Sequence, residues 1–126
     1  MASAVIMVAD RNGNVREFLR RELTGEGYVV RLASNGYELL RALWSEYPSL
    51  LILDPDLPLL AESRALAWLA QSGRLPVLFH GVPGARWPEE VVEHAFVEKG
   101  SSPVELKSWV ARLLSGDDRA AAGMAV

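Results

Sequence analysis

The sequence predicts an α/β fold in which a doubly wound, parallel β-sheet is covered by helices on both faces. Three observations lead to this prediction. Short apolar segments alternate, five times along the chain, with segments that are mostly helical in pattern. These apolar segments are hydrophobic throughout, as strands covered on both faces are, instead of alternating with polar residues. Half of the 126 residues are hydrophobic, which is rich for a chain of this size.

Five segments have the composition of strands. The most hydrophobic of them, Leu50 to Leu53, runs directly into the sequence Asp-Pro-Asp-Leu-Pro. A buried strand is therefore expected to end directly before a carboxylate, and this feature calls for an explanation. The predicted strands are residues 4–9, 28–33, 50–53, 76–79 and 95–98.

Helical periodicity fills the connections between the strands. The last helix is the best defined, because Ser102 can cap it, Pro103 fits its first position and Glu105 can complete a capping box. In the second helix, Trp44 and Tyr47 are expected on the same buried stripe as the leucines. The segment 88–94 forms at most two turns. The predicted helices are residues 14–27, 34–49, 62–73, 88–94 and 101–116.

Length and composition bound the possible functions. The length fits one domain, expected over residues 1–116, with residues 117–126 as a C-terminal tail without an apolar stripe. The chain has no cysteine, so disulfides and thiolate metal sites are excluded. A net charge of −3 without a basic cluster argues against direct nucleic-acid binding. No apolar run reaches membrane-spanning length, and a cytoplasmic location is expected.

Polar residues follow three of the predicted strands at the same end. Asp10 follows the first strand, Asp54 the third and Lys99 the fifth. The carboxyl ends of parallel strands meet at one edge of the sheet, here called the carboxyl edge, and ligands of such folds bind there. The three side chains are therefore expected in one crevice, which gives the buried strand before Asp54 a purpose.

These residues resemble the receiver domain of two-component response regulators, over essentially the whole chain. The family's Asp-x-x-x-Pro pattern matches Asp54 and Pro58, its lysine matches Lys99, and its switch aromatic matches Phe96. The resemblance implies a flavodoxin-like, five-stranded sheet in the order 2-1-3-4-5. It also implies that Asp54 accepts a phosphoryl group in a phosphorelay from a histidine kinase or phosphotransfer protein, that Lys99 pairs with that group, and that a downstream protein is the second partner.

Several positions depart from the family pattern. The family's second acid after the first strand is replaced by Arg11, and its hydroxyl residue after the fourth strand by Gly81, or by His80 after a slip of one residue. The family's Lys-Pro pair reads Lys99-Gly100, which removes the cis-proline turn, and its glycine-rich turn is absent from residues 58–63. The interval from the fourth to the fifth strand is short, so the fourth helix of the family is expected to be stunted.

The departures bear directly on magnesium. The resemblance implies that a magnesium ion is held by Asp10, Asp54, the backbone oxygen of Asp56 and the acid that Arg11 replaces. A guanidinium beside two carboxylates can supply the cation's charge as a permanent ion pair. We therefore expect impaired magnesium binding, with Arg11 or Lys99 paired to Asp54.

Three functions remain open at the level of sequence. The first is a phosphoryl-accepting response regulator whose output passes through protein contacts. The second is a phosphorylation-independent pseudo-receiver that acts as a protein-interaction module, for which Trp87 in the loop before the fifth strand is a candidate contact. The third is a phosphatase of the haloacid dehalogenase type, suggested by Asp54 and Asp56 but disfavoured by Pro58. We expect the chain not to be an enzyme.

Overall fold

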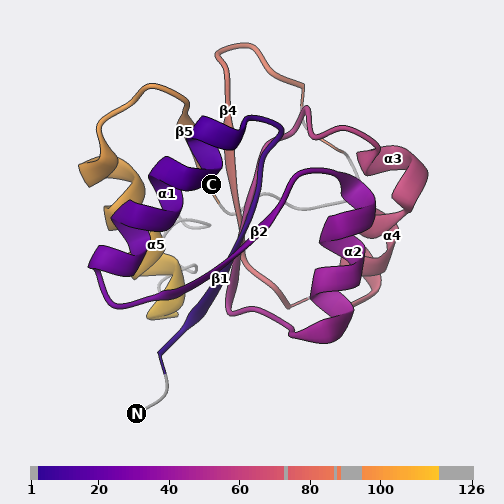
Figure 1. Cartoon of the computed structure of the whole chain (residues 1–126), viewed down its shortest axis with the longest axis horizontal. Coiled ribbons are helices and arrows are strands. Elements are labelled where there is room, and N and C mark those ends of the chain that lie inside the picture. The colour runs from indigo at the N-terminus through magenta and orange to yellow at the C-terminus, as the bar shows by residue number, and fades with distance from the viewer. Residues whose placement is uncertain (1–2, 73, 87, 89–94, 117–126) are drawn as a thin grey trace, which may run out of the picture.

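The computed structural model describes residues 3–72, 74–86, 88 and 95–116. Strands and helices alternate along most of this length (Figure 1). In chain order the elements are β1 (Val5–Ala9), α1 (Gly13–Gly25), β2 (Val29–Ala33), α2 (Gly36–Ser45), β3 (Leu50–Leu53), α3 (Leu60–Ser63), α4 (Ala65–Ser72), β4 (Val77–Gly81), β5 (Ala95–Glu98) and α5 (Pro103–Leu114).

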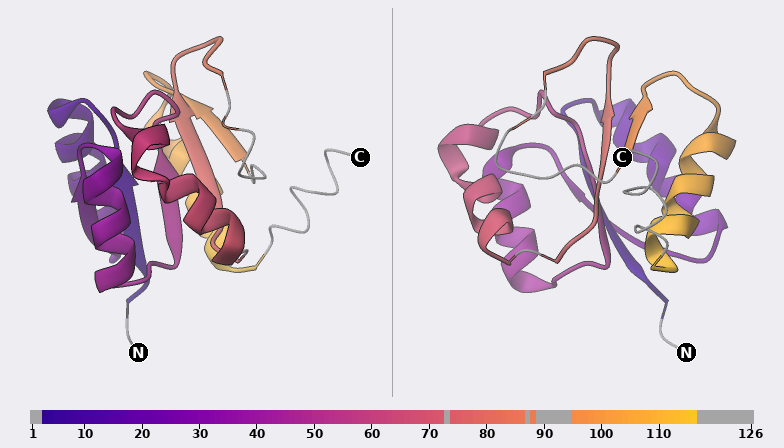
Figure 2. Two further views of the ribbon diagram at one scale, coloured as in Figure 1. Left: turned by 90° about the vertical axis from the view of Figure 1, so that its right-hand side faces the viewer. Right: turned by 180° about the vertical axis from the view of Figure 1, so that it is seen from behind.

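The five strands form one parallel sheet in the order β2-β1-β3-β4-β5. This confirms the predicted doubly wound fold and the strand order. Because β1 lies between β2 and β3, its carboxyl end is flanked by the ends of both neighbours. The loop that follows β4 rises above these strand ends in both views of Figure 2.

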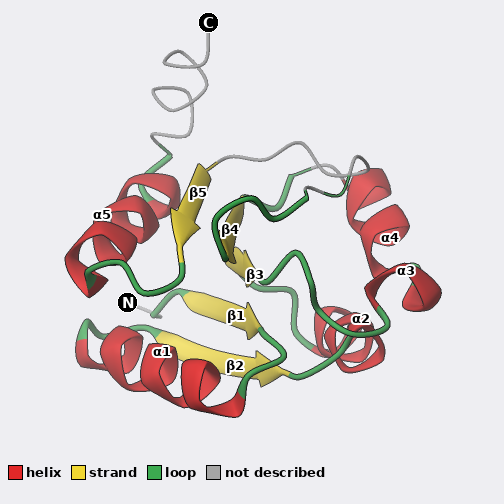
Figure 3. Cartoon of the chain, turned by 90° about the horizontal axis from the view of Figure 1, so that it is seen from above, coloured by secondary structure: helices red, strands yellow, loops and turns green. Residues whose placement is uncertain are grey.

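Two apolar clusters cover the two faces of the sheet, as the uniformly hydrophobic strands predict. One lies under α2, α3 and α4 and contains Leu51, Leu53 and Phe79 of the strands. The other lies under α1 and α5 and contains Ile6, Val8 and other alternate strand residues. Figure 3 shows the two helical layers on opposite sides of the sheet. Strand residues from both clusters are buried, among them Val8, Leu51, Leu53, Val77 and Phe79.

Side-chain caps explain why the helices begin where they do. The side chain of Asn12 accepts hydrogen bonds from the backbone of Asn14 and Val15, and the Asn35 side chain accepts one from Glu38. Ser102 caps α5 through the backbone N–H of Val104, as the sequence predicts. Asn12 matters most for function, since it starts α1 two residues after Asp10.

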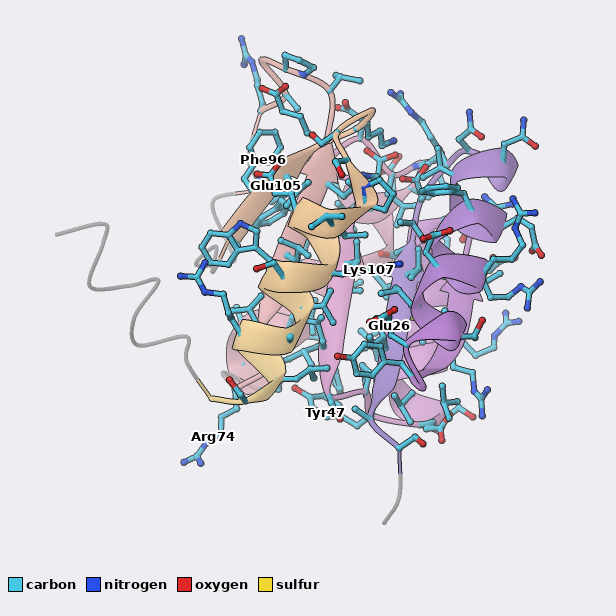
Figure 4. The ribbon with its side chains drawn as sticks, turned by 90° about the vertical axis from the view of Figure 1, so that its left-hand side faces the viewer. Glu26, Tyr47, Arg74, Phe96, Glu105 and Lys107 are labelled. Carbon is cyan, nitrogen blue, oxygen red and sulfur yellow. The ribbon has the colours of Figure 1, made fainter. Side chains whose placement is uncertain are left out.

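Salt bridges also join α1 and α5. The Lys107 ammonium of α5 lies 2.8 Å from a Glu22 carboxylate oxygen and 3.7 Å from one of Glu26. Figure 4 shows Lys107 beside Glu26, at the end of α1. These contacts are largely exposed and each stabilises the fold only weakly. They nevertheless fix how α5 sits against α1.

Two details of the α2–α4 layer differ from prediction. Trp44 is 72% exposed, because the buried face of α2 follows Gly36, Leu39 and Leu43 and leaves Trp44 outside it. Tyr47 is also exposed, beyond the end of the helix. The prediction that both lie on the buried stripe was therefore wrong.

The single helix predicted over 62–73 is divided. Arg64 adopts a left-handed conformation with φ of 61°, and this turn separates α3 from α4. Ser63 stabilises the break, because its hydroxyl donates to the Leu60 carbonyl and accepts from the Ala65 N–H. The stunted helix predicted over 88–94 is a different element. Residues 89–94 of that predicted helix, and Trp87, lie outside the described residues.

The connection from β3 to α3 contains a left-handed turn without glycine. Leu59 has φ of 61° there, although side chains rarely adopt this conformation. The Pro58 carbonyl accepts a 2.8 Å hydrogen bond from the Gly36 N–H at the start of α2. A Cβ atom at Gly36 would lie 2.2 Å from the Leu59 carbonyl oxygen, so only glycine fits this contact.

We predict that Leu51→Ala lowers the free energy of unfolding by roughly 2–5 kcal/mol, because Leu51 is fully buried in the middle strand. Chemical denaturation measures the change. The matched control is Val104→Ala on the outer side of α5, where the side chain is 73% exposed. Equal midpoints for the two variants would contradict the placement of Leu51 in the core.

We predict that Gly36→Ala destabilises the protein, although alanine normally favours a helix by about 1 kcal/mol over glycine. The added methyl group would collide with the backbone at Leu59. Gly25→Ala is the control, since it lies at the end of α1 with nothing within 4 Å of a built Cβ. Thermal melting should show Gly36→Ala well below both the wild type and Gly25→Ala. A neutral Gly36→Ala would show that α2 does not pack on the Leu59 turn.

Candidate functional site

Two buried carboxylates lie side by side at the carboxyl edge of the sheet. Asp10 and Asp54 are each 1% exposed, although each follows the last residue of its strand. Their backbones extend the ladder: the Asp10 N–H donates to Ala33, and the Asp54 N–H donates to Ala9 at 2.9 Å. Both acids are thus held by main-chain hydrogen bonds as well as by burial. The prediction that they meet in one crevice agrees with this geometry.

Lys99 joins these two acids. Its N–H donates to the Gly81 carbonyl at 2.9 Å, which fixes its backbone against the end of β4. Its ammonium lies 3.1 Å from Asp10 Oδ2 and 3.0 Å from Asp54 Oδ2. The side chain is only 15% exposed. In this setting each charge is largely removed from water, so each acid depends on the shared ammonium.

Arg11 adds a second cation above Asp54. Its Nε lies 3.6 Å from Asp54 Oδ2, and another nitrogen lies 3.9 Å from a carboxylate oxygen of Asp56. The Arg11 backbone N–H also points to Asp54 Oδ2, at 3.4 Å. Because the Arg11 side chain is 46% exposed, its ion pair is weaker than that of Lys99. The sequence predicts that Arg11 or Lys99 pairs with Asp54, and in the structure the side chains of both lie near Asp54 Oδ2.

Asp54 is oriented by the loop that follows it. The Asp56 N–H donates to Asp54 Oδ1 at 2.9 Å, while Oδ2 faces the two cations. The two oxygens of Asp54 therefore have different surroundings. The Asp56 carboxylate itself is largely exposed and reaches back only toward Arg11.

Asp10 is held ionised by its neighbours. Burial opposes its ionisation and is the largest single influence. The His80 ring, the Asn12 N–H at 2.9 Å and the Lys99 ammonium together outweigh burial and hold the pKa of Asp10 below its usual value. Arg16 supports the same turn, because its guanidinium donates a 2.7 Å hydrogen bond to the Asp10 carbonyl. Sequence analysis gave no role to Arg16 or Asn12, whose positions depend on how α1 leaves the strand.

The residues after the fourth predicted strand extend β4 and end it without a hydroxyl. Gly81 is its last residue, and a Cβ there would lie 2.9 Å from the Pro55 ring. His80, one residue earlier, is buried, and its Nδ1 lies 3.9 Å from Asp10 Oδ2. Both of these atoms are buried without a hydrogen-bond partner in the described part of the chain. Phe96, the predicted switch aromatic, pairs with Phe79 in the strand register and is half-buried against the α2–α4 cluster.

The donor set for a metal ion is small. Asp10 and Asp54 supply carboxylate oxygens and Asp56 a backbone carbonyl, but one ammonium already lies within 3.2 Å of both carboxylates. Among the described residues, no group of three or more acidic, histidine or cysteine side chains is arranged to hold a metal.

The described residues were also compared with the requirements of a membrane span. None of their helices is long and apolar enough to cross a membrane.

Curated relatives carry the names of a transcriptional regulator and a response regulator. The chain is 30% identical over 125 residues to the "Probable transcriptional regulator ycf27" of Pyropia yezoensis, covering 96% of this chain and 51% of that protein. It is 40% identical over 77 residues to the "Response regulator MprA" of Mycobacterium ulcerans, covering 60% of this chain and 33% of the relative. The chain thus spans about half the length, or less, of these relatives. No protein-family profile matches it.

Solved structures agree with the sequence relatives. The response regulator TrrA of Thermotoga maritima, solved with Mg²⁺ and a beryllium fluoride, is 27% identical with a TM-score of 0.76, over 87% of this chain and 98% of that chain. A signal receiver domain of a histidine kinase from Syntrophus aciditrophicus is 28% identical with a TM-score of 0.75, over 90% and 92%. Sheet order, crevice and relatives agree: the chain has the receiver fold of two-component response regulators.

Proposed function

We propose that this chain is a response-regulator receiver that accepts a phosphoryl group on Asp54, with Lys99 as the residue that stabilises the transferred charge. The observation that supports this most is the Lys99 ammonium, which lies 3.0 Å from Asp54 Oδ2 and 3.1 Å from Asp10 Oδ2. A buried carboxylate at the open edge of a parallel sheet, beside a fixed cation, is suited to attack phosphorus. The phosphodonor is a histidine kinase or phosphotransfer protein.

In the proposed reaction, a carboxylate oxygen of Asp54 forms a bond to phosphorus while the bond from phosphorus to the donor's histidine nitrogen breaks. The released electron pair stays on that nitrogen. Negative charge on the phosphoryl oxygens is offset by Lys99, and Arg11 is close enough to contribute. Without such cations, a carboxylate and a phosphoryl group repel one another, and the carboxylate is a poor nucleophile.

We further propose that magnesium binding is impaired, because Arg11 stands where the receiver pattern has an acid. Two unit charges 4 Å apart repel by about 4 kcal/mol at an effective dielectric of 20. Arg11 is nearly half exposed and can turn away, so the penalty is smaller. Half of it would weaken binding by a factor of about 30, since 1.4 kcal/mol corresponds to tenfold.

A second candidate function is a phosphorylation-independent interaction module. It is favoured by the satisfied state of Asp54, whose oxygens already meet Lys99, Arg11 and the Asp56 N–H. It is also favoured by Gly81, which has no hydroxyl to connect a phosphoryl group to Phe96. In this case the fold would hold one conformation, and Phe96 would keep one orientation.

The partners follow from the same proposal. Two curated relatives are named as a response regulator and a transcriptional regulator, and this chain matches about half or less of each. We propose that this domain itself passes its signal to a downstream protein and does not bind nucleic acid, because it has a net charge of −3 and no basic cluster. The phosphatase alternative remains the least favoured.

We predict that phosphoramidate or acetyl phosphate adds one phosphoryl group to the chain, seen in the intact mass. Asp54→Asn should abolish the addition because it removes the nucleophilic oxygen. Asp56→Asn is the matched control, since Asp56 lies two residues away and is exposed. No addition to the wild type, with or without magnesium, would reject the receiver proposal and leave the interaction module.

We predict that wild-type protein shows no saturable amide NMR shifts at low-millimolar magnesium, whereas Arg11→Asp gains a site centred on Asp10 and Asp54. The substitution removes a positive charge and restores a carboxylate. Arg16→Asp is the control, because it changes the charge equally, and the Arg16 guanidinium donates its hydrogen bond to the Asp10 carbonyl and not to a carboxylate oxygen. Saturation of the wild type with the same shifts would contradict the impaired-magnesium proposal.

A further inference from the structure

Most of the positive charge of Lys99 is already offset before a phosphoryl group arrives. The ammonium lies 3.0 Å from Asp54 Oδ2 and 3.1 Å from Asp10 Oδ2, so two buried acids share one unit of charge. The backbone N–H of Lys99 is bonded to the Gly81 carbonyl, and the side chain is only 15% exposed. Lys99 is therefore fixed between the acids, and a second source of positive charge is needed for the transfer.

Arg11 is a cation beside Asp54 whose hydrogen-bond donors are not committed to the acids. Its Nε lies 3.6 Å from Asp54 Oδ2, and another nitrogen lies 3.9 Å from a carboxylate oxygen of Asp56. Both distances exceed the roughly 2.7–3.2 Å of an N–H···O hydrogen bond, so these contacts are ion pairs only. Because the side chain is 46% exposed, the guanidinium has room to move toward a group that forms on Asp54.

A guanidinium with free donors suits the oxygens of a phosphoryl group. It is permanently charged, and its planar fork of N–H groups can bind two oxygens of one phosphoryl group at once. Phosphorus bonded to Asp54 would carry its oxygens toward Arg11, since the guanidinium already lies beside Oδ2. Arg11 is thus placed to stabilise the charge that develops during transfer.

The same crevice is a poor site for a divalent cation. The Lys99 ammonium lies within 3.2 Å of a carboxylate oxygen of Asp10 and of Asp54. An ion bound to both acids would have to displace this ammonium and would also approach the Arg11 guanidinium. In the described part of the chain, no third acidic, histidine or cysteine side chain completes a set of ligands with these acids.

From this geometry we propose that Arg11 takes the part of the divalent cation, so that Asp54 accepts a phosphoryl group without metal. An Asp54 oxygen forms the bond to phosphorus, and the bond from phosphorus to the leaving group breaks with its electron pair on that group. The guanidinium contacts the phosphoryl oxygens and neither gains nor loses a covalent bond. This inference rests on the proposed receiver function and deepens it, because it makes metal unnecessary and makes the rate depend on Arg11.

Acetyl phosphate, which releases acetate when its P–O bond breaks, tests the inference without a kinase. The measurement is the rate at which the intact mass gains one phosphoryl group, in EDTA and in millimolar magnesium. We expect the wild type to react at the same rate in both. Arg11→Gln should slow the reaction about 100-fold in EDTA, as removal of one transition-state donor typically does. Arg11→Lys should be slowed less, because it keeps the charge but not the fork.

Metal dependence separates a catalytic role of Arg11 from a structural one. Arg11→Asp adds a carboxylate beside Asp10 and Asp54, so it should be slow in EDTA and regain its rate with magnesium. Arg11→Gln adds no carboxylate and should not be rescued, a difference that a loss of structure would not produce. The control is Arg41→Gln, which makes the same charge change at an exposed position of α2 and should react like the wild type. Thermal melting reports whether each variant is folded.

Three results would each overturn this inference and leave the receiver proposal intact. They are a wild type that reacts only with magnesium, a folded Arg11→Gln that reacts in EDTA at least as fast as the wild type, and a folded Arg11→Asp that magnesium does not accelerate. The second result would show that Arg11 shields Asp54 instead of assisting it. A wild type that reacts under neither condition would reject the receiver proposal, and this inference with it.

Discussion

Two carboxylates that are buried side by side repel one another unless a cation lies between them, and in this protein the Lys99 ammonium contacts both Asp10 and Asp54. Lys99 is 45 residues away from Asp54 in sequence and 89 away from Asp10. It reaches them because β4 and β5 extend the sheet beyond β3 and end at the same edge. Removing the ammonium would leave Asp54 with the half-exposed Arg11 and would deprive Asp10 of its ammonium partner, so strand order and the charge cluster support one another.

Arg11 changes the character of this cluster. Asp10, Asp54 and Asp56 carry three negative charges, and Lys99 and Arg11 offset two of them with permanent cations. In the proposal of impaired magnesium binding, these two cations take over part of the charge that a dication would supply. The same two cations are placed to meet a phosphoryl group. In the proposal made here, the loss of magnesium affinity and the acceptance of phosphate are therefore compatible.

The start of α1 lies next to the crevice, where Asn12 and Arg16 contact Asp10. Lys99 and His80 both lie beside Asp10, Lys99 through its ammonium and His80 through Nδ1. The opposite layer, with α2 packed on the Leu59 turn through Gly36, holds the loop that orients Asp54.

The sequence by itself determined the alternation of strands and helices, the two-sided core and the set Asp10, Asp54 and Lys99. These follow from hydrophobic patterning and from which residues come directly after a strand, both of which are local properties. The exposure of Trp44 and the break at Arg64 were not predictable, because helical spacing does not specify how a helix turns on the sheet. The contacts of Arg16 and His80 with Asp10 likewise needed tertiary structure. They depend on the angle at which α1 leaves β1 and on the register of β4, which are set by packing between distant segments.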